Sequence, residues 1–215
     1  LAQSRSLRGS EMTKKTKDVY KKQRKPSIFI VCEGRNKTEK AYFDNFKERS
    51  APFNLYCKTC ESTDILSMAK KAASIFVEND LDLDLGDRVF CLVDLDLEQT
   101  KYDKFITAKK KYKKIDIIPS NPCFEVWLQY YFTKFPKGVG SSQKAKDEMA
   151  KYLPGYTESM DVVAEAHLGM NDHVKAIQNS EMRNSYYSSE QSLIEKNPYT
   201  DVATVVTLLI SYRKE

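Results

Sequence analysis

Acidic side chains follow two of the most apolar segments of this 215-residue chain. Glu33 comes directly after SIFIVC (27–32), and Asp94 and Asp96 follow RVFCLV (88–93). Short, nearly continuous apolar runs are typical of strands that are buried on both faces of a parallel sheet. Because chemistry in such sheets gathers where the strands end at their carboxyl edge, we expect these carboxylates to form a site there.

Asp94 and Asp96 have the chemistry of a divalent-cation site. In an extended chain, residues two apart point to the same face, and two neighbouring carboxylates repel each other. Mg²⁺ or Mn²⁺ would relieve that repulsion and prefers oxygen ligands. Glu33 could be a third ligand or a general base, and Glu98 is a weaker fourth ligand candidate. A lone D-x-D sequence can equally start a loop, and the second acidic strand end is what favours a metal site.

Glu125 lies in the segment SNPCFEVW (120–127), which combines a turn with the start of a helix. Asn121 can cap that helix and Pro122 suits its first turn. Glu125 then falls where the helix dipole favours an anion, which is a sufficient structural role. The alternative is a catalytic carboxylate that points into the acidic cleft, and the sequence leaves both interpretations open.

Seven lysines lie between positions 101 and 114, interleaved with apolar residues in an amphipathic pattern. The default interpretation is the solvated face of a helix. If the helix flanks the acidic cleft, Lys101, Lys104, Lys109 and Lys110 would form a positive rim that holds a nucleic-acid backbone.

The cysteines and histidines carry weaker signals. Cys57 and Cys60 have C-x-x-C spacing on an expected strand, which would send the two thiols to opposite faces and favours a structural role. His167 and His173 are expected at the surface. The five cysteines are odd in number and too sparse for a disulfide scaffold, which predicts a reducing, cytoplasmic setting.

The net charge of +5 is unevenly distributed along the chain. Residues 1–26 hold nine Lys or Arg and two acids, a balance of +7, which leaves −2 for residues 27–215. We expect a disordered basic arm over residues 1–26, with residues 1–11 a leader left from cloning, although a nucleic-acid contact is an alternative role for the arm. The sequence has no apolar stretch long enough to span a membrane and no secretory signal.

Predicted strands and helices alternate along the chain, which favours an α/β fold with a mostly parallel central sheet flanked by helices. We expect a core over residues 27–135 and a C-terminal helical extension over 136–215 that packs on it. The predicted strands are 27–32, 53–60, 88–93 and 115–118, the last closed by Pro119. The predicted helices start near Thr38, after Ser62-Thr63-Asp64 and near Lys101, and continue with 124–132, parts of 142–195 and a last helix capped by Thr200 or Asp201.

Four sequence blocks, in order, resemble the signature of the RloB-like family. They are IVCEG (30–34) with Thr38-Glu39 and Tyr42-Phe43, then Asp94-Leu95-Asp96, SNPCFEVW (120–127), and NPYT (197–200) before the last predicted helix. The resemblance implies a Toprim-type fold, the metal-binding α/β module also found in topoisomerases and primases. It implies that Glu33 is a general acid/base or metal ligand and that Asp94 and Asp96 hold Mg²⁺. Proteins similar to this family are often encoded beside an ATPase in prokaryotic phage-defence or restriction loci.

Two functions are compatible with these patterns. The first is a Mg²⁺- or Mn²⁺-dependent nuclease that cleaves nucleic-acid phosphodiester bonds, with Glu33, Asp94, Asp96 and Glu125 as catalytic residues. The alternative is a non-catalytic effector subunit that binds nucleic acid or an ATPase. A homo-oligomer is compatible with either function, and neither function involves a membrane.

Overall fold

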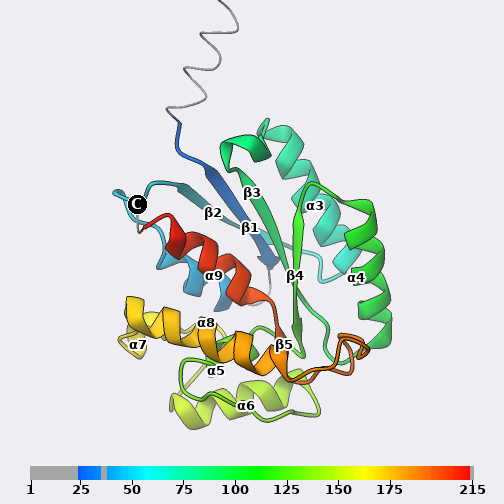
Figure 1. Cartoon of the computed structure of the whole chain (residues 1–215), viewed down its shortest axis with the longest axis vertical. Helices are drawn as coiled ribbons and strands as arrows, with labels where there is room; N and C mark the ends of the chain where they lie inside the picture. Colours follow the sequence, from blue (N-terminus) through cyan, green and yellow to red (C-terminus); the bar gives the residue numbers. More distant parts are fainter. Residues whose placement is uncertain (1–23, 35–37, 214–215) are drawn as a thin grey trace, which may run out of the picture.

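A five-stranded sheet forms the centre of the protein (Figure 1). The structure is a computed structural model that describes residues 24–34 and 38–213, so the arm expected over residues 1–26 lies almost wholly outside the described residues. The strands lie in the order β2-β1-β3-β4-β5, and the first four are parallel while β5 is antiparallel to β4. Their bounds are Ser27–Glu33 (β1), Asn54–Cys60 (β2), Arg88–Asp94 (β3), Asp116–Asn121 (β4) and Tyr199–Thr200 (β5). The predicted α/β class with a mostly parallel sheet is therefore confirmed.

Helices cover both faces of the sheet because the central strands are apolar on both faces. In β1, Ile28 and Ile30 belong to one hydrophobic cluster, whereas Phe29 and Val31 belong to the other. The second cluster is covered by α3 (Ile65–Glu78) and α4 (Gln99–Lys111), which lie on one face. The first cluster is covered by α2 (Thr38–Asp44), α5 (Glu125–Gln129), α8 (Met170–Ser185) and α9 (Val202–Ser211).

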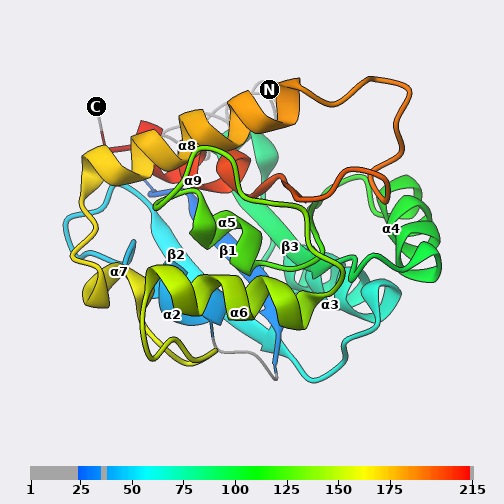
Figure 2. The same ribbon diagram turned by 90° about the horizontal axis from the view of Figure 1, so that it is seen from below.

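The C-terminal part of the chain is an integral part of this architecture. The remaining helices are α6 (Ser142–Tyr152) and α7 (Val162–Glu165), with a short 3₁₀ turn, η1, at Leu83–Leu85. Strand β5 extends the central sheet, and α9 packs on its face. Helices α5 and α6 lie across the end of the molecule where the parallel strands finish, as seen from below in Figure 2.

Local signals explain where several elements begin. Asp64, in the predicted start signal, caps α3, and its carboxylate accepts a hydrogen bond from the Ser67 N–H at 3.0 Å. Cys57 packs beside one hydrophobic cluster and Cys60 beside the other, which confirms that the two thiols lie on opposite faces of β2.

The predicted end of β4 was wrong, because Pro119 lies inside the strand opposite Val93. Proline removes a backbone donor and is normally tolerated only where the ladder does not need one. Strand β5 pairs with β4 only at the last two residues, Ser120 and Asn121, so the flank of Pro119 on that side carries no strand pairing. The strand can therefore continue past the proline to the carboxyl edge.

His173 is the second element that the sequence misplaced. It was expected at the surface, but it is buried on α8 and its Nδ1 atom shares a 2.7 Å hydrogen bond with the Tyr131 hydroxyl. Ala176 and Ser180, three and seven positions later, are also buried. This helical spacing places His173 on the face of α8 that packs on the core. None of the helices described over residues 24–34 and 38–213 has the length and apolarity needed to cross a bilayer.

Candidate active site at the carboxyl edge of the sheet

The ends of β1 and β3 bring Glu33 and Asp94 to the same edge of the sheet. Val31 lies opposite Cys91, and counting on from this register puts Glu33 one position short of Asp94. Neighbouring strands are about 4.8 Å apart, so the two Cα atoms lie about 6 Å from each other. The alternation along each strand aims Glu33 toward the face covered by α3 and Asp94 toward the face covered by α2 and α5.

A glycine is required directly after Glu33. The Gly34 N–H donates a 2.6 Å hydrogen bond to the Cys60 carbonyl, and a Cβ atom on Gly34 would lie only 2.7 Å from that oxygen. The Glu-Gly pair of the sequence therefore combines a carboxylate with the close backbone approach that fixes its position at the strand end.

Asp94 is at the centre of a group of carboxylates. Its pKa is raised well above the usual range, mainly because burial disfavours the charged form. The negative charges of Glu39, Glu125, Asp96 and Glu33 raise it further, in that order of importance. These charges place Glu33, Asp96 and Glu125 within electrostatic reach of Asp94, although Glu33 leaves β1 toward the other face of the sheet, and they add Glu39 to the group.

Glu39 is the acidic residue that sequence reasoning missed. Its side chain is 4% exposed, and burial followed by the charges of Glu125 and Glu33 raises its pKa to about 8. Its buried Oε2 atom accepts no hydrogen bond from the described residues. The signal was present in the sequence, because Glu39 precedes the buried Tyr42 and Phe43 by three and four positions and so shares their face of α2.

Glu125 begins α5 and is buried, with its Oε1 atom accepting a 2.9 Å hydrogen bond from the Tyr156 hydroxyl. Its position is compatible with both a structural and a catalytic role. Glu125 lies in the first turn of α5, and its negative charge also raises the pKa of Asp94. Residue Phe124, and not Asn121, occupies the N-cap position.

The prediction that Asn121 caps α5 was therefore wrong, and its buried amide has another role. Its Oδ1 atom accepts the Leu97 N–H at 3.1 Å. Its Nδ2 atom donates to three carbonyls of the segment before β5 at 2.9–3.2 Å, those of Leu193, Ile194 and Lys196. Asn121 thus ties the D-x-D turn to a segment more than 70 residues away.

The chain does not stay extended from Asp94 to Asp96, as the D-x-D interpretation had assumed. Asp96 and Leu97 both have positive φ angles, of 51° and 61°, and the Asp96 N–H donates to the Pro122 carbonyl at 2.9 Å. The turn points the Asp96 carboxylate toward Lys101 and Ser142, which both hydrogen-bond to it. The two aspartates therefore leave the strand in different directions while remaining electrostatically coupled.

Helix α6 contributes positive charge to the site from the C-terminal part of the chain. Lys146 has an 18% exposed side chain and forms an ion pair with Glu158. Its charge also lowers the pKa of Glu39, and the charge of Glu125 raises the pKa of Lys146. No local pattern predicts a role for Lys146 at the site, because its position there depends on how α6 crosses the sheet edge.

Comparison with known proteins identifies the family. The family model described as "RloB-like protein" matches residues 28–209, which is most of the chain. The chain belongs to the RloB-like family. The matched segment extends from β1 to α9, so it includes both the parallel strands and the helices that close the site. No curated protein and no solved structure matches this RloB-like protein.

The remaining predicted ligand, Glu98, is exposed at the N-terminal end of α4 in the RloB-like protein. Its charge acts on the Lys101 ammonium and raises the pKa of that group, after larger effects from Asp96 and Asp94. Glu98 therefore lies at the rim of the site and outside the buried group of acids.

The lysines of α4 do not form a single stripe. Lys101 reaches the acidic site, whereas Lys104 forms a 2.8 Å ion pair with the aspartate that caps α3. Lys109 lies on the opposite flank, near the aspartate preceding α9, where its charge partly offsets the rise that burial causes in the pKa of that aspartate. Lys110 is exposed. Helical geometry spreads these side chains around the axis, so only Lys101 contacts the candidate site.

Carboxylate oxygens are the ligands that a divalent cation prefers, but the acids of the described residues are not already arranged around one metal position. Among residues 24–34 and 38–213, no three His, Cys, Asp or Glu side chains are arranged as ligands of one metal ion. Mg²⁺ usually keeps several waters and takes only one or two protein carboxylates, together with phosphate oxygens of a substrate. The buried Oε2 atom of Glu39 without a hydrogen-bond donor, and the raised pKa of Asp94, are the features that fit a positive ion.

Proposed function

We propose that this RloB-like protein is a metal-dependent phosphodiesterase that acts on nucleic acid, with a Toprim-type site and a role in prokaryotic phage defence. The observation that supports the proposal is the group of carboxylates around Asp94, in which Asp94 and Glu39 have raised pKa values. A group of neighbouring carboxylates, of which Glu39 and Glu125 are buried, is costly unless a cation or protons compensate the charge. A phosphodiesterase site needs such a cation-binding position beside its substrate.

The acids would have separate tasks. Asp94 and Asp96 would hold Mg²⁺ or Mn²⁺, which when bound would polarise the phosphate and stabilise the leaving oxygen. Glu33 or Glu39 would accept a proton from the attacking water. Glu39 suits this task because its pKa of about 8 lies near physiological pH, where a general base works best.

The lysines and hydroxyls around the acids would orient the reacting groups. Lys146 lies close enough to Glu39 and Glu125 to influence their electrostatics, and an ammonium there can stabilise negative charge on a phosphate. Tyr156 donates a hydrogen bond to Glu125 and fixes that carboxylate. Lys101 and Ser142 bind both carboxylate oxygens of Asp96, so metal binding by Asp96 requires at least one of them to move.

The decisive experiment incubates the purified protein with tRNA, single-stranded DNA and plasmid, in Mg²⁺, in Mn²⁺ and in EDTA. We expect cleavage with metal only, and its loss in Asp94→Asn and in Glu33→Gln, each with a wild-type circular dichroism spectrum. Glu165→Gln, at an exposed position on α7, is the matched control and should cleave normally. Undiminished cleavage by the Asp94→Asn/Glu33→Gln double variant would refute the assignment.

A non-catalytic effector subunit is the second candidate function, and the engagement of both Asp96 oxygens favours it. In that case the protein would bind nucleic acid or an ATPase without cleaving. Binding without cleavage under every metal condition, with and without an ATPase partner, would support this function. Cleavage that begins only when an ATPase is added would instead indicate a nuclease that its partner switches on.

A further inference from the structure

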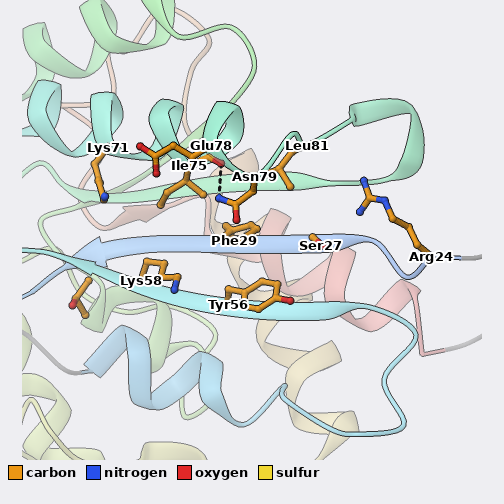
Figure 3. Close-up of a pocket in the computed structure, with 11 residues that line it drawn as sticks. Arg24, Ser27, Phe29, Tyr56, Lys58, Lys71, Ile75, Glu78, Asn79 and Leu81 are labelled. Atoms are coloured by element: carbon orange, nitrogen blue, oxygen red, sulfur yellow. Dashed lines mark hydrogen bonds between the residues drawn. The ribbon is translucent and has the colours of Figure 1, made fainter. Parts of the chain in front are cut away.

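A second surface feature lies outside the acidic site, along the edge strand β2. A groove of about 440 Å³ runs between this strand and α3 (Figure 3). Phe29 and Tyr56 line it from the strands, and Lys71 and Ile75 line it from the helix. The groove exists because α3 packs on β1 and β3 and leaves the same face of β2 uncovered.

Tyr56 is an aromatic platform in this groove. Its side chain is 40% exposed, although aromatic rings usually gain most when they are buried. It stacks on the buried Phe29, with ring centroids 4.6 Å apart and an angle of 22° between the planes. The buried ring holds the exposed one in a fixed orientation, which is the arrangement that base stacking requires.

The charges of the groove favour an anion. Its lining contains three cationic side chains, Arg24, Lys58 and Lys71, and one anionic side chain, Glu78, a balance of +2. Arg24 is bound to Asp87, but Lys58 and Lys71 are exposed, and neither forms an ion pair with a carboxylate in the part of the chain that the structure describes. These two lysines are available to a ligand with repeated negative charge.

The groove also leads toward the edge of the sheet where Glu33 lies. Strand β2 is parallel to β1, and its last residue, Cys60, lies opposite Glu33. Tyr56 is four residues earlier, which at strand geometry is about 13 Å from that edge. Lys58 lies between Tyr56 and Cys60 on the same strand, so a nucleic-acid strand bound at Tyr56 would pass this cation before it reaches Glu33.

We propose that this groove binds single-stranded nucleic acid, with a base stacked on Tyr56 and the phosphate backbone beside Lys58 and Lys71. The proposal rests on the proposed function only in taking the bound strand as the substrate. A duplex already stacks its bases internally and cannot use the platform. A peptide added to the edge of β2 would pair with its backbone and would leave the aromatic ring and the lysines without a role.

Fluorescence anisotropy tests the groove without catalysis, using the full chain with labelled 20-nucleotide RNA and DNA single strands in EDTA. Tyr56→Ala should weaken binding of single strands about five- to 150-fold, the usual effect of removing one stacking partner. Tyr56→Phe keeps the ring and should bind like the wild type. Duplex affinity should not change in either variant.

A charge series provides an independent readout. The double variant Lys58→Gln/Lys71→Gln should reduce the slope of log affinity against log salt by about 1.4, since each phosphate contact to a single strand contributes about 0.7. The matched control, Lys134→Gln/Lys137→Gln, removes the same charge from exposed positions between α5 and α6 and should leave that slope unchanged.

Three results would overturn the proposal: wild-type affinity in Tyr56→Ala, an equal loss of slope in the Lys134→Gln/Lys137→Gln control, or no binding of either strand by the wild type. The first two are compatible with metal-dependent cleavage and so leave the proposed function intact. Conversely, Tyr56-dependent binding without any cleavage in Mg²⁺ or Mn²⁺ supports the groove and refutes the nuclease.

Discussion

Replacing Glu39 by glutamine tests the electrostatics of the site directly. The pKa of Glu39 is about 8 in the folded protein, against an ordinary value of 4.5. Because the folded pKa is raised, the unfolded chain loses its proton first as the pH rises. The contribution of this group is therefore fully present below pH 4.5 and is lost progressively between pH 4.5 and 8.

The magnitude follows from that pH window. Each pH unit inside it lowers the free energy of unfolding by about 1.4 kcal/mol, so the wild type should lose about 3 kcal/mol between pH 5 and pH 7.5 through Glu39. Glutamine cannot ionise, so Glu39→Gln should not show this loss. It should also relieve Asp94, because Glu39 is the largest charge effect on the pKa of that residue.

The assay is urea unfolding in EDTA at several pH values, with the free energy of unfolding taken from the midpoint and slope of each transition. Any penalty for a buried amide without hydrogen-bond partners is independent of pH, so it does not affect the comparison of the two pH dependences. Glu181→Gln, on the exposed surface of α8, is the control, and its free energy of unfolding should change with pH as that of the wild type does. If the free energies of unfolding of the wild type and of Glu39→Gln change equally with pH from 5 to 7.5, the Glu39 carboxylate is not buried as described.

Two further predictions concern protons. Mg²⁺ or Mn²⁺ at 100 times its dissociation constant should raise the free energy of unfolding by about 2.7 kcal/mol, and its binding should release protons. Calorimetry in buffers of different ionisation enthalpy measures the released protons, and Asp94→Asn should lose both effects. Metal binding without proton release would contradict the raised pKa values. Burial lowers the pKa of His173 to about 4, from 6.5, so its contribution is present above pH 6.5 and is lost as the pH falls toward 4, a loss of about 3 kcal/mol. His173→Phe should abolish that acid dependence in urea unfolding between pH 6.5 and 4.5, and an unchanged slope would show that His173 does not titrate as a buried neutral ring.

Much of the fold could be predicted from the sequence because its signals are local. The apolar runs that became β1 and β3 are buried on both faces, and such runs have few alternatives to a central parallel strand. Asp64 caps α3 through a contact only three residues long. Two acidic strand ends were enough to place Glu33 and Asp94 at one edge, because parallel strands finish together.

The details that failed depend on contacts between distant segments. The D-x-D turn bends because the Asn121 side chain accepts the Leu97 N–H, and Asn121 is in turn held by the segment before β5. Lys146 approaches Glu39 only because α6 crosses the sheet edge. Glu39 is different, since its spacing to Tyr42 already indicated a buried face; what local sequence could not show is that this face meets Asp94.

The charges at the site explain why a bound cation would stabilise this group of acids. Two described cations act on them: Lys101, which is bound to Asp96, and Lys146, which is shared with Glu158. Among the described residues, neither forms an ion pair with Glu39 or Asp94, and burial together with the mutual repulsion of the acids raises the pKa of both. A divalent cation bound by Asp94 would favour the charged carboxylates and so lower the pKa values that burial and repulsion have raised. An acidic cluster that served only the fold would not be expected to gather these carboxylates, because their repulsion destabilises the folded state unless a cation offsets it.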